Sequence, residues 1–89
     1  MKANFKQIKV EVMFDEYKEL DIAKSLGNYI HQNTTDIGLD DTARAIYHSE
    51  GDVEISNEHA AMILTIVQGK DSPYLAATKR AIINELTEK

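Results

Sequence analysis

The sequence predicts an α+β fold: an N-terminal β-hairpin followed by about four helices packed around a central apolar helix at residues 57–69. Three observations predict it. Apolar and polar residues alternate over residues 8–14, whereas apolar residues recur every three or four positions after residue 22. The run 60–67 holds one polar residue, Thr65. Because a strand buries every second side chain and a helix every third or fourth, the change in period marks the change from strand to helix.

The hairpin is expected to join a strand at residues 8–14 to a second strand at residues 18–22. Asp15 and Glu16 are the turn residues between them. Since a one-residue slip would move every side chain to the opposite face, the loop should keep the apolar residues of both strands together. An odd number of loop residues does this.

Two registers satisfy that condition. A three-residue loop pairs Val12 with Leu20 and Val10 with Ile22, whereas a five-residue loop pairs Phe14 with Leu20. The longer loop spares Tyr17 the left-handed conformation that a three-residue loop usually gives to glycine. In either register we expect Val10, Val12, Leu20 and Ile22 to be buried on one face, with Lys9 and Glu11 exposed.

The first two helices follow from helical spacing and from the residues at their ends. Asp21 is the expected N-cap of the first, which fades at residues 33–35. The second should begin after a turn at Gly38 and end near Ser49, with acidic residues in its first turn, where the helix dipole favours anions. Their expected inward residues are Ala23, Leu26 and Ile30, then Leu39, Ala43, Ile46 and Tyr47.

The last two helices are bounded by stronger signals. Val53–Ile55 is a short extended stretch, after which Ser56 should cap the central helix and Gly69 should close it in the C′ position. A helix that is apolar on nearly all sides belongs at the centre of a fold or at an interface. Ser72 followed by Pro73 predicts the start of the fourth helix, because proline is favoured at the first helical position. Leu75, Ile82 and Leu86 should point inward, and the four helices should cover one face of the hairpin.

Length and composition indicate one small acidic domain spanning residues 1–89. The chain is 43% hydrophobic, carries a net charge of −5 and has no cysteine, so the expected environment is the reducing cytoplasm. No apolar run is long enough for a membrane span. The acidity is concentrated in residues 25–69, where Arg44 stands against seven acidic residues.

No pattern of catalytic, cofactor-binding or metal-ligating residues emerges. Histidines and acids gather at residues 48–59, but they match no metal-binding spacing, so a solvated acidic loop is the expected structure. No serine has a nucleophile-elbow context, and no glycine-rich loop is present to hold phosphate. His31 is expected to complement the dipole at a helix end. The residues of the acidic cluster are His48, Glu50, Asp52, Glu54, Glu58 and His59.

A helix-turn-helix interpretation of residues 39–69 meets two objections. The connection at residues 49–56 is longer than the three or four residues of that motif, and the would-be recognition helix has no lysine or arginine. A segment this acidic would also repel the phosphates of a duplex. The only basic cluster is Lys70, Lys79 and Arg80, for which a solvated helix face is the simpler interpretation.

The segments GLDDTARAIY at 38–47, VEISNEHAAMILTIV at 53–67 and SPYLAATKRAIINEL at 72–86 resemble small uncharacterised proteins encoded among phage and prophage genes. The resemblance covers about two-thirds of the chain and carries over no functional residue. It implies an accessory or assembly protein of a mobile element.

Together these observations favour a non-enzymatic protein-binding or assembly module, whose partner is another protein or a second copy of the chain. The main alternative is a nucleic-acid-associated regulator acting through the basic cluster. A small metal- or ligand-binding domain is the third. The sequence leaves open whether the basic cluster or the acidic residues Glu50, Asp52 and Glu54 are functional.

Overall fold

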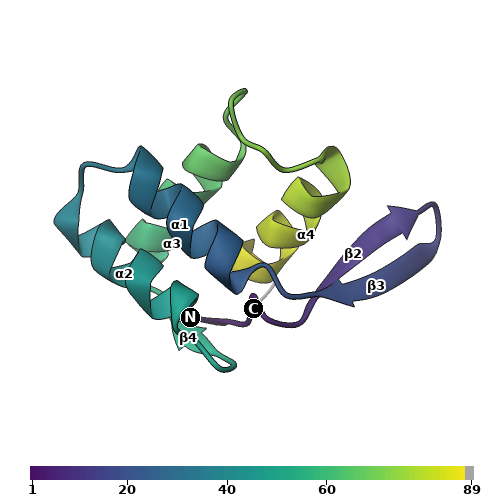
Figure 1. Cartoon of the computed structure of the whole chain (residues 1–89), viewed down its shortest axis with the longest axis horizontal. Helices are drawn as coiled ribbons and strands as arrows, with labels where there is room; N and C mark the ends of the chain where they lie inside the picture. The colour runs from purple at the N-terminus through teal and green to yellow at the C-terminus, as the bar shows by residue number, and fades with distance from the viewer. Residues whose placement is uncertain (88–89) are drawn as a thin grey trace.

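The predicted α+β fold, with its N-terminal hairpin and four helices, is confirmed (Figure 1). The structure is a computed structural model that describes residues 1–87. In chain order its elements are β1 (Lys2–Ala3), β2 (Ile8–Met13), β3 (Glu16–Leu20), α1 (Ala23–Asn33), α2 (Ile37–Tyr47), β4 (Val53–Glu54), α3 (Asn57–Val67) and α4 (Ala76–Thr87).

The helices form the body of the molecule, and α3 contacts each of the other three. Ile63 and Val67 of α3 are fully buried, and the expected inward residues of α1 and α2 are buried as well, except Tyr47, which is half-buried. Helical spacing therefore identified most of the core correctly, because a helix can bury only one stripe of its surface.

The N-terminal segment contributes a strand and core residues that alternation did not indicate. β1 pairs antiparallel with β4, so that Ala3 lies opposite Val53. Phe5 is fully buried, and its carbonyl accepts a hydrogen bond from the Ile22 N–H at 2.9 Å. The segment is therefore held between β4 and the start of α1.

The hairpin keeps the expected parity but not the expected register. Val10 lies opposite Lys18 and Ile8 opposite Leu20. In the three-residue-loop register Val10 would lie opposite Ile22, so the observed register is shifted by four residues along β3. The odd loop length is wrong, since only Phe14 and Asp15 separate the strands. A register shift between Glu11 and Met13 supplies the extra residue that preserves parity. The left-handed position falls on Asp15, with φ of 65°, a conformation that aspartate adopts more readily than most residues.

The hairpin reaches beyond the helices instead of lying beneath them (Figure 1). Ile8 and Val10 are buried, and the main helix contact of β2 is with α4, so the expected packing of four helices on one hairpin face is wrong. Val12 and Leu20 were expected to be buried but are 43% and 37% exposed. The hairpin extends away from the helices, which leaves its far end in solvent (Figure 1).

Helices α1 and α2 begin at residues other than those expected. The N-cap of α1 is Ile22, and Asp21 Oδ1 instead accepts the Ala23 N–H at 3.1 Å. Helix α2 starts at Ile37, because Asp36 caps it by accepting the Leu39 N–H at 2.7 Å. It ends at Tyr47, two residues before the expected end.

Helix α3 begins as expected and α4 does not. Ser56 caps α3 by accepting the His59 N–H at 3.1 Å, and the helix ends at Val67, two residues before Gly69. Helix α4 starts at Ala76 instead of Pro73, since Leu75 provides the carbonyl for its first hydrogen bond, from Lys79 N–H. Leu75 was expected to point inward but is 78% exposed, whereas Ile82 and Leu86 are buried.

Candidate functional site

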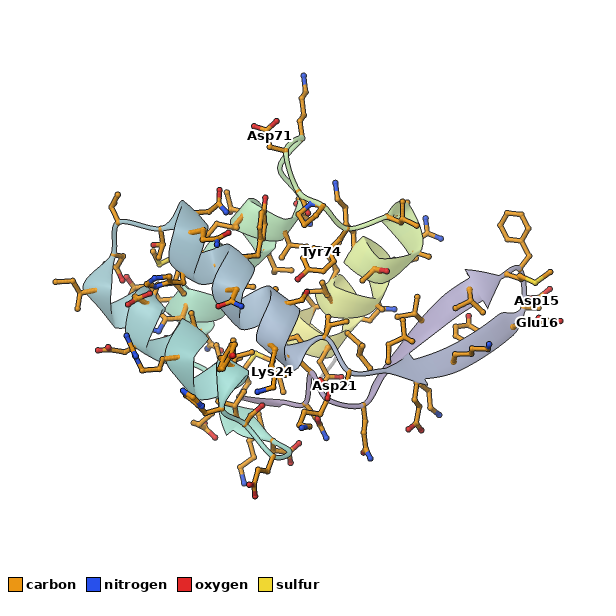
Figure 2. All side chains as sticks on the ribbon, in the orientation of Figure 1. Asp15, Glu16, Asp21, Lys24, Asp71 and Tyr74 are labelled. Atoms are coloured by element: carbon orange, nitrogen blue, oxygen red, sulfur yellow. The ribbon has the colours of Figure 1, made fainter. Side chains whose placement is uncertain are left out.

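Several exposed apolar side chains gather at the far end of the hairpin. Phe14, in the turn, is 95% exposed, and Met13, the last residue of β2, is 64% exposed; Figure 2 labels the neighbouring Asp15 and Glu16. Large apolar side chains that remain in water forgo the stabilisation that burial would provide. We call this surface the hairpin end, and its residues are Val12, Met13, Phe14 and Tyr17.

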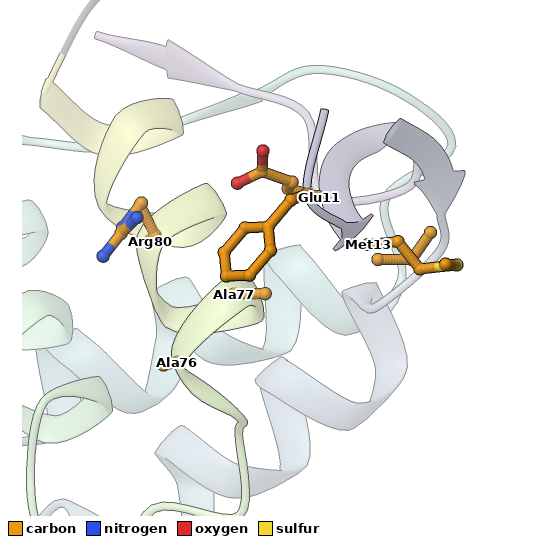
Figure 3. A pocket seen from close by; sticks show the side chains of 7 residues that line it. Glu11, Met13, Ala76, Ala77 and Arg80 are labelled. Atoms are coloured by element: carbon orange, nitrogen blue, oxygen red, sulfur yellow. The ribbon is translucent and has the colours of Figure 1, made fainter. Parts of the chain in front are cut away.

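A groove of about 450 Å³ separates the hairpin end from the start of α4. Ala76 and Ala77 form its α4 wall, where small side chains leave room beside the strand (Figure 3). Arg80 and Glu11 are its charged residues, from α4 and β2 respectively. The groove is thus mainly apolar, with one cation and one anion in its lining.

Tyr17 lies on a second, smaller depression between the same two elements. Its lining includes Lys9 and Glu11 from β2, with Arg80 and Asn84 from α4. The aromatic ring is 63% exposed. The exposed apolar surface therefore continues from the turn onto β3.

The members of the expected basic cluster have different surroundings in the structure. The Lys79 ammonium donates to the Gly69 carbonyl at 3.4 Å, near the end of α3, where a cation is favoured. Arg80, the next residue, lines the groove at the hairpin end. Lys70 is exposed on the loop that joins α3 to α4. Lys79 therefore reaches the residue before Lys70, whereas Arg80 faces the hairpin.

The histidines of the acidic segment take separate positions. The His48 ring packs edge-on against Tyr47, with ring centroids 4.9 Å apart. The His59 Nδ1 lies 2.9 Å from Thr42 Oγ1, so it joins α3 to α2. In residues 1–87 no three histidine or acidic side chains are placed to hold a metal ion together.

Thr42, His59 and Asp36 have the residue types of a hydrolytic triad. Their geometry differs from one, because His59 Nε2 lies 4.0 Å from Asp36 Oδ2, beyond hydrogen-bond distance. That oxygen already accepts the Leu39 N–H at the start of α2. The three residues therefore orient the start of α3 against the start of α2.

His31 and Asp40 join the end of α1 to the first turn of α2. The His31 Nδ1 contacts Asp40 Oδ1, and the Arg44 guanidinium approaches the other oxygen of Asp40 at 4.0 Å. His31 lies in the last turn of α1, as its expected interaction with the helix dipole requires. The contact with Asp40 adds a role between helices that helical spacing alone does not reveal.

Tyr74 attaches the loop before α4 to α1 (Figure 2). Its hydroxyl lies 2.7 Å from Ser25 Oγ, and its ring meets Tyr29 edge-on at 5.9 Å. Burial raises the pKa of the Tyr74 hydroxyl, the Ser25 hydrogen bond lowers it, and Tyr29 raises it further. This contact is structural, since it holds the loop against α1.

The sequence patterns did not indicate that the residues of the hairpin end form an exposed surface. Val12 and Phe14 share the parity of the strand residues expected to be buried, so alternation places them with the core. No residue pattern in the sequence indicates that their side chains stay exposed.

No protein-family model, curated protein or solved structure matches this chain. None of the helices in the described part of the chain is long and apolar enough to cross a membrane.

Proposed function

We propose that this protein works by binding another protein chain through the hairpin end, without catalysis. The observation that carries the proposal is Phe14, which is 95% exposed beside an apolar groove. Aromatic side chains are enriched at protein interfaces, where a few of them supply most of the binding energy. The resemblance to small phage and prophage proteins adds the context of an accessory or assembly role in the cytoplasm.

The charges at the hairpin favour a protein over a nucleic acid. Asp15, Glu16 and Glu19 stand near Lys18, so the turn and β3 are net negative. Phosphate contacts supply most non-specific DNA affinity, and an acidic surface weakens them. Arg80 alone of the basic cluster lines the groove.

The proposal is tested with a photo-reactive phenylalanine analogue in place of Phe14, in the cells that make this protein. The matched control places the same analogue at Ile37, which is 80% exposed at the start of α2, away from the hairpin. We expect a discrete crosslinked protein from position 14 and none from position 37. Phe14→Ser should abolish co-purification of that protein, whereas Ile37→Ser should not.

A different result would overturn the proposal. If position 14 yields no crosslink, and the purified protein shifts duplex DNA in a salt-sensitive way at physiological ionic strength, the nucleic-acid alternative is correct. Substitution of Lys79 and Arg80 by alanine would then abolish the shift.

A further inference from the structure

Strand β3 presents an unpaired edge. Its one strand partner in the described residues is β2, and each of its residues, from Glu16 to Leu20, is exposed. An edge strand carries N–H and C=O groups that can pair with another strand. The partner that completes this edge must offer a strand whose side chains match those of β3.

We propose that this partner is a second copy of the chain, whose β3 pairs antiparallel with the first around a twofold axis at Tyr17. The inference deepens the proposed function, on which it rests, by naming the bound protein. The two hairpins would form one sheet with strand order β2-β3-β3-β2. A twofold interface is self-complementary, so the β3 sequence must match its own reverse.

Among Tyr17, Lys18 and Glu19, the central residues of β3, only one gives that match when the twofold axis passes through it. In a symmetric antiparallel pair, the strand residue on the axis lies opposite its own copy. An axis at Lys18 places lysine opposite lysine, and an axis at Glu19 places glutamate opposite glutamate, which is unfavourable in both cases. An axis at Tyr17 pairs two aromatic rings and places Glu16 opposite Lys18 twice. The segment Glu16-Tyr17-Lys18 is therefore complementary in charge to its own copy.

The same centre brings together apolar side chains that the monomer leaves in water. An axis at Tyr17 brings the turn of one copy, which carries the exposed Phe14, towards the end of β3 in the other copy, where Leu20 is 37% exposed. Asp15 and Glu19 would meet only in a strand that continued through Asp15. The φ of 65° at Asp15 turns the chain away there, which separates the two carboxylates.

The charge pairing can be reversed without disturbing the hairpin of each copy. Within its own hairpin, Glu16 lies opposite Met13 and Lys18 opposite Val10, so neither side chain has a charged partner there. Glu16→Lys and Lys18→Glu would each create two like-charge pairs across the axis. The double variant restores both opposite-charge pairs with the net charge unchanged.

The test measures self-association of the full chain by light scattering after gel filtration and by sedimentation over a range of concentrations. We expect the wild type to dimerise, each single variant to dissociate with a Kd raised by about tenfold or more, and the double variant to recover. Circular dichroism checks that the monomers remain folded. A wild type that stays monomeric at every concentration overturns the proposal, as does a double variant no better than the single ones.

A second experiment locates the axis. The chain has no cysteine, so Tyr17→Cys introduces a unique thiol. Directly opposed residues in antiparallel strands have Cα atoms about 4.5 to 5.5 Å apart, within the span of a disulfide. We expect mild oxidation to crosslink Tyr17→Cys dimers but not Glu19→Cys dimers. A dimer that crosslinks only through position 19 would overturn the assigned axis.

Failure of this inference is distinguishable from failure of the proposed function. The Phe14 crosslink joins two copies of the chain if the dimer forms through β3. A crosslink to a different protein, with a monomeric chain in solution, overturns the dimer and supports the proposed function. The absence of any crosslink at position 14 overturns the proposed function itself.

Discussion

At the scale of single residues, Gly27 permits the close approach of α1 and α2. A Cβ atom at this position would lie 2.8 Å from the Ala43 carbonyl oxygen and 2.8 Å from Tyr47 Cβ. The first of these is a backbone atom, which cannot move aside without displacing α2. The absence of a side chain, and not backbone flexibility, is what this position requires.

We expect Gly27→Ala to destabilise the protein. Overpacking costs about 1 to 3 kcal/mol, which exceeds the gain in helix propensity of up to about 1 kcal/mol. Urea denaturation monitored by circular dichroism measures the change. Gly51→Ala is the matched control, since no atom lies within 4 Å of its added Cβ, and its stability should stay within about 0.5 kcal/mol of wild type. A Gly27→Ala variant as stable as that control would show that the two helices can separate.

The raised pKa of Tyr74 predicts that the free energy of unfolding falls at alkaline pH. Burial raises the pKa of its hydroxyl in the folded state, so the folded protein holds its proton to higher pH than the unfolded chain does. The contribution of Tyr74 to the free energy of unfolding is therefore fully present below about pH 10, the pKa of tyrosine in the unfolded chain. It is lost as pH rises through the higher pKa of the folded state.

The measurement compares wild type with Tyr74→Phe by urea denaturation from pH 8 to about pH 11, since that substitution removes the titrating group. The stability difference between the two proteins should shift in favour of Tyr74→Phe above about pH 10. A difference that is constant across the range would mean that Tyr74 ionises as readily in the folded state as in the unfolded one.

At the scale of elements, α3 is the helix on which the core depends. Ile63 is fully buried and the helix contacts α1, α2 and α4. Ile63→Ala should therefore cost about 2 to 5 kcal/mol, through lost burial and the cavity left behind. Ile37→Ala is the matched control, because Ile37 is 80% exposed and its truncation leaves no cavity. Equal denaturation midpoints for the two variants would place Ile63 at the surface.

The hairpin and α4 show where local patterns mislead. Alternation predicted the strands and their parity, but the register depended on Asp15 and on the shift near Val12. Ser72 and Pro73 carry the signals of a helix start, yet α4 begins at Ala76. Tyr74 lies against Ser25 and Tyr29 of α1, and this contact between distant segments takes precedence over the local signal.

At the scale of the whole molecule, folding is expected to depend on the apolar core without a metal ion. The core draws on the N-terminal segment, β2 and all four helices of the described residues. We expect EDTA to leave the Tm unchanged, and calcium or zinc to leave it unchanged as well, by differential scanning fluorimetry. A Tm that falls by several degrees in EDTA would show that the acidic segment around Glu50, Asp52 and Glu54 binds a structural ion.

The sequence by itself determined the α+β class, the four helices and most of their buried stripes. These properties depend on neighbouring residues alone, since helical and strand periods are local. Only the tertiary structure decided the register of the hairpin, the pairing of β1 with β4 and the exposure of Val12, Phe14 and Leu20. Whether an apolar side chain is buried depends on what packs over it, and beyond Val10 a groove separates the hairpin from the start of α4. The hairpin end is exposed because the hairpin and the start of α4 are separated by a groove, a spatial relation that no local sequence pattern contains.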